Sequence, residues 1–369
     1  MKLATTLAIA AALGGCDKKK SKEPDKGAGS SGAKPTAVEQ QVPRPSQQQQ
    51  LQMPPLVLAD DPKRAEKIEL GHTLFFDKRL SGKNDRACYS CHQNEDGGGG
   101  HDPIAIGSGD VKQTRHAPVI WNVAYYEPHP DKGALYWDGR AKSLAANAKA
   151  AWAKGNMGAG EDNLDKKAAE LYAIPGYKKL FDAAFPKTEI KADQVIGALV
   201  EYERTLLCKD TAYDKFAAGD KTALSEQQQR GLDIFSGKGQ CMICHAPPYF
   251  STAMGADNGI FFNVGIGTKD VPEDKVDVGR MKVTNNKDDW AAFKPPSLRN
   301  VTKSAPYFHD GSVAKLEDAV KLMTTGGVPN KNRNNLMADR QLSDAERADL
   351  VAFLGALDCP GKLEEPKLP

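Results

Sequence analysis

The sequence has little excess charge, little strand-like alternation, and few cysteines and histidines. It holds 50 Lys and Arg against 48 Asp and Glu, a formal net charge of +2, which does not favour nucleic acid as a partner. Because apolar and polar residues rarely alternate, we expect a mainly α chain with long loops such as 94–118 and 249–296. With seven Cys and seven His in 369 residues, a repeated pattern of these residue types is improbable by chance.

Such a pattern is present, because Cys-x-x-Cys-His occurs twice. Its residues are Cys88, Cys91 and His92 in the first copy, and Cys241, Cys244 and His245 in the second. This is the attachment signature of c-type haem, in which two thiols bond the porphyrin and the adjacent His ligates iron. A zinc site or a dithiol redox pair uses the same cysteines, but neither requires a His after both pairs. We therefore predict two covalently bound haem c groups.

The N-terminus resembles an export signal rather than a membrane span. Lys2 precedes the apolar run 3–13, which is too short to cross a bilayer. Residues 13–16 resemble a bacterial lipobox, in which Cys16 becomes the lipidated first residue of the mature chain. The alternatives are an ordinary secretory peptide and a buried cysteine. We predict a periplasmic protein of the bacterial cell envelope, anchored to the membrane by lipid on Cys16.

Composition and motif spacing divide the chain. Residues 1–16 form the lipoprotein signal peptide, and 17–58, rich in Lys, Gly, Ser and Gln, are expected to form a disordered tether. Because the two motifs lie about 150 residues apart, we expect two cytochrome c-like domains with one haem each. These are an N-terminal domain at 59–212 and a C-terminal domain at 213–360, followed by a tail at 361–369.

Amphipathic spacing predicts helices over 65–76, 192–207, 224–235 and 343–354, the last two opened by capping boxes at Ser225 and Ser343. Gly71 and Gly231 begin similar pentapeptides ahead of the two motifs, which indicates an internal duplication.

Two cysteines remain after the haems and the lipid take five. Cys208 follows the helix predicted over 192–207, and Cys359 follows the last predicted helix. An even pair in an oxidising compartment favours a disulfide that closes a long loop. Two separately buried thiols are the alternative.

Further strings carry a family resemblance. They are Arg115-His116-Ala117-Pro118, Tyr136-Trp137-Asp138-Gly139-Arg140-Ala141, Pro175-Gly176-Tyr177, Glu203-Arg204-Thr205-Leu206 and Ala305-Pro306-Tyr307-Phe308-His309-Asp310-Gly311. Together with two haem motifs, they resemble the bacterial di-haem cytochrome c peroxidase family, which includes the MauG-type enzymes. The resemblance covers about residues 67–357 and implies that electrons enter at the C-terminal haem and that hydrogen peroxide is reduced to water at the N-terminal haem.

The resemblance also assigns residues to this electron path. Met323, fourteen residues after His309, matches the axial Met of the C-terminal haem, and a thioether ligand raises the reduction potential. Met254 and Met281 are alternatives, and so is a core position for Met323. MauG-type members have Tyr at the position of Met323. Trp137 matches the family's bridging tryptophan, although a Trp alone more often serves core packing.

The peroxide site departs from the family in two respects. Ser108 stands where many members have a second axial His, so we expect an open N-terminal haem, with His101 as an alternative ligand. Asn156 stands where the family has a catalytic Glu, and an amide cannot relay a proton at neutral pH. Glu161 is the candidate to replace this Glu. The family's Gln in this pocket corresponds to Asn147.

A third departure concerns calcium between the domains. The family's backbone carbonyl ligands correspond to Ser304 and Pro306, but the Asn ligand is His116 here, and imidazole suits calcium poorly. Calcium binding therefore stays open. The resemblance further implies a small electron-donor protein, a cytochrome c or a cupredoxin, and a homodimer.

We therefore predict a cytochrome c peroxidase, with Trp137, Ser108, Asn156 and Glu161 at its reaction site. One alternative is MauG-like oxidation of a Trp or Tyr in a partner protein. The other is a non-enzymatic di-haem electron carrier or sensor, which the missing His and Glu would favour.

Overall fold

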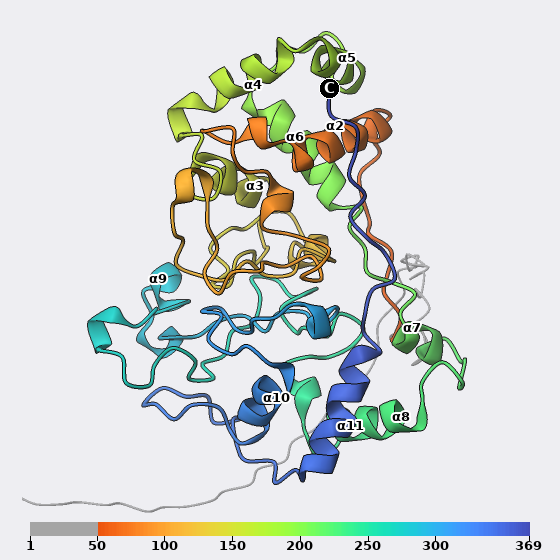
Figure 1. Ribbon diagram of the computed structural model, residues 1–369, viewed down its shortest axis with the longest axis vertical. Coiled ribbons are helices and arrows are strands. Elements are labelled where there is room, and N and C mark those ends of the chain that lie inside the picture. Colours follow the sequence, from red (N-terminus) through yellow and green to blue (C-terminus); the bar gives the residue numbers. More distant parts are fainter. Residues whose placement is uncertain (1–50) are drawn as a thin grey trace, which may run out of the picture. The chain divides into compact units, whose positions relative to one another are not determined.

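We describe the protein from a computed structural model over residues 51–369 (Figure 1). The predicted signal peptide, Cys16 and all but the last residues of the predicted tether lie outside these residues. The α-helices of the described part are α2 (Arg64–Phe76), α3 (Leu144–Ala153), α4 (Leu164–Tyr172), α5 (Pro175–Ala184), α6 (Ala192–Glu203), α7 (Ala212–Ala217), α8 (Glu226–Ser236), α9 (Met281–Thr284), α10 (Leu316–Thr324) and α11 (Asp344–Gly355).

Pairing between extended segments is limited, within residues 51–369, to isolated bridges. The predicted fold class, mainly α with long loops, is confirmed. None of the helices in this part of the chain combines the length and the apolar character that crossing a bilayer requires.

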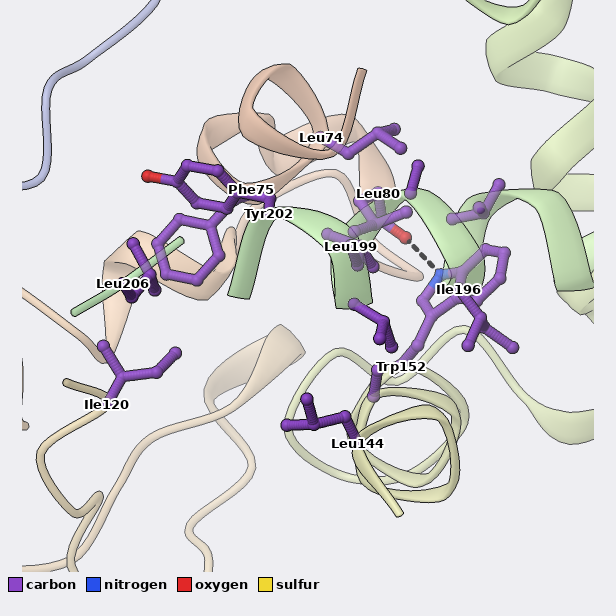
Figure 2. Close-up of a cluster of buried hydrophobic side chains, with 14 of the residues drawn as sticks. Leu74, Phe75, Leu80, Ile120, Leu144, Trp152, Ile196, Leu199, Tyr202 and Leu206 are labelled. Atoms are coloured by element: carbon purple, nitrogen blue, oxygen red, sulfur yellow. Dashed lines mark hydrogen bonds between the residues drawn. The ribbon is translucent and has the colours of Figure 1, made fainter. Parts of the chain in front are cut away.

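Helices α2 and α6 cross at Gly71 and form the centre of the first hydrophobic cluster. A Cβ at Gly71 would overlap the carbonyl of Ala198 on α6, so only glycine permits this approach. Figure 2 shows the cluster, in which α6 contributes Leu199 and α3 contributes Trp152. The Trp152 indole donates a hydrogen bond to the carbonyl of Leu80 at 2.9 Å. Cys88 and Tyr89 of the first haem motif pack against the same cluster.

Helices α8 and α11 repeat the arrangement in the second half of the described chain. They lie side by side (Figure 1), and a Cβ at Gly231 would overlap the carbonyl of Asp349 on α11. Phe235, Phe250 and Phe353 pack against one another in the second hydrophobic cluster. Gly71 and Gly231 thus serve the same purpose in two helix crossings. The domain boundary between 212 and 213 stays a prediction.

Helix α6 is shorter than the sequence predicted, because it ends at Glu203 rather than near 207. The chain must leave the helix there to reach the side chain of Asn122. The Asn122 amide oxygen accepts a hydrogen bond from the Cys208 backbone N–H at 2.8 Å, and the Asn122 backbone N–H donates to Leu206 at 2.7 Å.

The C-terminal segment returns from α11 to the first cluster. Cys208 and Cys359 form a disulfide, with their Cα atoms 5.2 Å apart. Beyond it, Leu363 is buried in the first cluster, and its backbone N–H donates to Asn94 at 2.8 Å. The chain then ends close to α2 and α5 (Figure 1), so the predicted tail packs against the N-terminal half.

Candidate functional site

Both haem motifs begin as a single 3₁₀ turn, Cys88–Ser90 in the first half and Cys241–Ile243 in the second. The backbone N–H of Cys91 donates to Cys88 at 3.1 Å, and that of Cys244 donates to Cys241 at 3.2 Å. None of these four cysteines forms a disulfide within residues 51–369. Each turn therefore presents two cysteines and a following His from a short, hydrogen-bonded stretch of chain.

The two histidines are oriented in the same way. His92 Nδ1 lies 3.1 Å from the carbonyl of Gly98, and His245 Nδ1 lies 3.0 Å from that of Phe250. A carbonyl only accepts, so each Nδ1 carries the proton and Nε2 keeps its lone pair for a metal. Burial lowers the pKa of both imidazoles, which favours the neutral form that ligates iron.

His245 lies in the wall of a deep, mainly apolar cavity. Cys241, Cys244 and Met323 line the same cavity, and Met323 is placed there by α10. His309 also lines it and stacks on Phe293, with ring centroids 3.7 Å apart. The alternatives Met254 and Met281 lie outside this lining. Two thiols, an imidazole and a thioether around one apolar space fit a haem c with His and Met ligands.

His92 lies in the wall of a second cavity. Both motif cysteines line it, together with Asn147, Asn156 and Glu203. Tyr136, which donates a hydrogen bond to the carbonyl of Asn147 at 3.2 Å, lies in the same wall. The thiols and the imidazole fit a second haem c, and the cavity is more polar than the first in the side chains that face it.

Two residues, Trp137 and Lys294, line both cavities. The Lys294 backbone N–H donates to the carbonyl of Trp137 at 3.0 Å. Its ammonium group lies 3.4 Å from the centre of the Tyr126 ring, and burial lowers the pKa of Lys294 to about 7. An indole and a buried amine therefore separate the two cavities. A motif in the sequence predicted the role of Trp137, but no pattern indicated Lys294.

Ion pairs hold the chain on either side of Trp137. Arg115 donates to both oxygens of Asp277, at 2.6 and 2.8 Å, and to Asp138 at 2.7 Å. Arg280 donates to the carbonyls of Asp138 and Gly139 at 2.9 and 3.0 Å. These contacts join residues 115, 138 and 277, so the position of the indole is fixed from both halves of the described chain.

Ser108 and His101, which the sequence placed near the iron of the first haem, lie outside the cavity lining. The Ser108 hydroxyl donates to Asp85 at 2.6 Å. This contact and the Gly109 N–H hold the pKa of Asp85 at about 2, well below its usual range. His101 is 79% exposed and pairs with Asp96.

The structure places the two acid–base candidates in different surroundings. Asn156 lines the cavity, whereas Glu161 is 57% exposed and forms an ion pair with Lys149 at 2.9 Å. Sequence reasoning overlooked Glu203, which carries a buried carboxyl into the same lining. No local pattern distinguishes Glu203 from Glu201, which lies on the same helix and is equally buried.

Of the residues that the sequence linked to calcium, His116 is engaged in a hydrogen bond with the backbone. The His116 imidazole is buried and donates through Nδ1 to the carbonyl of Asp102 at 2.9 Å, and Ser304 and Pro306 contribute only backbone carbonyls. Within residues 51–369, three or more His, Cys, Asp or Glu side chains never gather around one point. Calcium takes six to eight oxygen ligands, and backbone carbonyls count among them, so calcium binding through the carbonyls of Ser304 and Pro306 stays a prediction.

Comparison with known proteins gives consistent matches. A family model described as di-haem cytochrome c peroxidase matches residues 65–222. Cytochrome-c peroxidase IdrP1 of Denitromonas iodatirespirans is 33% identical, over 86% of this chain and 89% of that protein. Methylamine utilization protein MauG of Methylorubrum extorquens is 34% identical, over 84% and 83%. The structure of a MauG-like protein associated with microbial copper homeostasis matches with a TM-score of 0.77 and 30% identity, over 86% of this chain and 96% of the other.

Proposed function

Since the chain belongs to the di-haem cytochrome c peroxidase family, we propose that it reduces hydrogen peroxide to water with electrons from a small redox protein. One observation carries the proposal. Trp137 lies in the walls of both cavities, so a single aromatic side chain connects the place where electrons would enter with the place where peroxide would react.

Four residues would hold the haem at which electrons enter the protein. When bound, the two haem c groups supply iron that changes oxidation state by one electron at a time. Cys241 and Cys244 would hold one group, and His245 and Met323 would offer a nitrogen and a sulfur ligand from different segments of the cavity wall. A thioether favours the reduced metal and so raises the potential, which suits a site that accepts electrons from a donor such as a cytochrome c or a cupredoxin.

At the other cavity, the residues leave room for peroxide. Cys88, Cys91 and His92 hold the second group, and Ser108 is engaged with Asp85 instead of facing the cavity. This supports an N-terminal site with an open coordination position that needs no prior reductive activation. Asn156 can hydrogen-bond peroxide there but cannot give up a proton.

Export, lipid anchoring at Cys16 and a homodimeric state belong to the same proposal. They rest on the N-terminal sequence pattern and on the family, and they place the enzyme in the bacterial envelope, where c-type haem is attached.

The test combines spectroscopy with a peroxide reaction. Electron paramagnetic resonance of the ferric protein should show a high-spin signal from the open site. The reduced protein should then be oxidised by stoichiometric peroxide, according to H₂O₂ + 2H⁺ + 2e⁻ → 2H₂O, faster than free haem. Two low-spin signals and no reaction with peroxide would instead support an electron carrier.

A second candidate is MauG-like oxidation of an aromatic residue in a partner protein. It is favoured by the 34% identity to MauG and by the MauG-like structure. Met323 distinguishes the two, because the resemblance assigns Tyr to this position in MauG-type members. Turnover with peroxide and a cytochrome donor alone supports the peroxidase, whereas a strict requirement for one protein substrate supports the alternative.

A further inference from the structure

Glu203, the last residue of α6, has a buried carboxyl oxygen without a partner. The residue is 8% exposed, and Oε2 meets no hydrogen-bond donor among the described residues. A charged carboxylate in such a place is costly, because it loses water without gaining a compensating contact. The carboxyl of Glu203 therefore has a physical reason to carry a proton.

Its neighbours do not neutralise it. Burial raises the pKa of Glu203 to about 8, Arg204 opposes this, and Glu127 adds to it. The Arg204 guanidinium is already used by Glu201, to which it donates at 2.6 Å. Tyr136 and Cys88 also lie near Glu203. A tyrosine is neutral at physiological pH, and Cys88 bonded to haem as a thioether would carry no charge.

Glu203 belongs to the wall of the cavity in which peroxide would react. It lines the cavity of His92 together with Asn147 and Asn156. Helix α6 packs on α3, the helix that carries Asn147 and precedes Asn156. His92, by contrast, is held by the carbonyl of Gly98 in the loop after the motif. The helices that carry Glu203 and Asn147 therefore pack against each other, and neither belongs to the loop that holds the His92 imidazole.

We infer that Glu203 is the catalytic residue that holds the proton for peroxide cleavage, in place of the carboxylate that is missing at Asn156. The inference rests on the proposed function. The O–O bond of H₂O₂ breaks as one oxygen takes the proton from Glu203 and leaves as water. Two electrons from the donor protein and a further proton from solvent complete the second water. Glu203 then regains its proton from solvent.

Glu203→Gln tests this, because glutamine keeps the size of the side chain and cannot release a proton. Glu201→Gln is the matched control, since Glu201 lies on the same helix, is also 8% exposed and pairs with Arg64 and Arg204 outside the cavity. Haem content, both midpoint potentials, the rate of oxidation by stoichiometric peroxide and the infrared band of a protonated carboxyl are measured for each protein.

We expect Glu203→Gln to lower the peroxide rate at least about a hundredfold and to remove the carboxyl band, with haem content and potentials retained. The wild-type rate should fall as pH rises through the Glu203 pKa, and the variant rate should be flat. Glu201→Gln should keep the rate, the band and the pH profile. If wild type and Glu203→Gln react equally fast with peroxide, the inference about Glu203 is wrong but the proposed function stands. The same holds if the variant loses rate only together with haem or with a shift of the midpoint potentials. A wild-type protein that does not react with peroxide overturns the proposed function as well.

Discussion

The indole N–H of Trp137 donates to the carbonyl of His116 at 2.9 Å. At the other end of the same residue, the carbonyl of Trp137 accepts from the backbone N–H of Lys294 at 3.0 Å. Trp137 is therefore held by the segments near 116 and 294, which themselves form parts of the cavity walls. The first hydrogen bond restrains the indole ring, and the second restrains the backbone that carries it.

Trp137→Phe should slow electron transfer between the two haem groups at least about tenfold, which corresponds to about 1.4 kcal/mol of activation free energy. Phenylalanine is smaller and leaves the carbonyl of His116 without its donor, so the contact across the gap loosens. Stopped-flow spectroscopy after peroxide mixing follows the oxidation of each haem separately.

The control for this experiment is Trp121→Phe. Trp121 is 6% exposed and packs in the first hydrophobic cluster, outside the lining of both cavities. It should keep the wild-type transfer rate. Equal rates in wild type and Trp137→Phe would show that the electrons take another route.

Met323→Leu should lower the midpoint potential of the C-terminal haem by an amount on the order of tenths of a volt, because the ferrous iron loses its thioether ligand. Spectroelectrochemical titration measures the potential directly. Met254→Leu and Met281→Leu serve as controls, since both residues lie outside the cavity of His245. If one of these controls shifts the potential and Met323→Leu does not, Met323 is not the ligand.

Local signals in the sequence predicted much of the fold. The Ser225 hydroxyl accepts from Gln228 at 3.2 Å, and Ser343 accepts from Glu346 at 3.2 Å, so both predicted capping boxes are present. Such caps are read over four residues and need no tertiary information. The end of α6 at Glu203 was not predictable in this way, because it depends on the contact between Cys208 and Asn122, 86 residues apart.

The site was predictable where it follows a fixed spacing and not where it depends on solvent exposure. Each haem motif indicates covalent haem attachment and an iron ligand within five consecutive residues. Asn156 and Glu161 lie five positions apart, yet one lines a cavity and the other faces solvent beside Lys149. Glu203 was not predicted, because the lack of a hydrogen-bond donor at its carboxyl oxygen is a property of the packed structure. No local sequence pattern indicates it.

Loss of the disulfide should reduce the free energy of unfolding by roughly 2–5 kcal/mol. Cys208 and Cys359 are 151 residues apart, so the cross-link removes many conformations from the unfolded chain. The variant carries Cys208→Ala together with Cys359→Ala, and chemical denaturation compares it with wild type. An unchanged free energy of unfolding would mean that packing of Leu363 and its neighbours alone secures the C-terminal segment.

Asp214→Asn should destabilise the protein by roughly 3 kcal/mol. The carboxylate accepts from Arg299 at 2.7 and 2.8 Å, and the Arg299 side chain is fully buried. The variant leaves this guanidinium without a charge partner inside the second hydrophobic cluster. Denaturant unfolding measures the loss, and Asp344→Asn is the control. Asp344 is 95% exposed and pairs with Arg347 on the surface, so its replacement should change stability by less than about 0.5 kcal/mol.

The same ion pair predicts how stability depends on pH. Burial raises the pKa of Asp214, but the hydrogen bonds from Arg299 outweigh it, so the pKa in the folded protein lies below its usual value. The unfolded chain therefore takes up the proton first, at a pKa of about 4. The contribution of Asp214 is complete above that pH and is lost as the pH falls through the folded pKa. The difference in stability between wild type and Asp214→Asn should therefore be constant near neutral pH and shrink below about pH 4. A difference that stays constant down to strongly acidic pH would show that Asp214 contributes through its shape rather than through its charge.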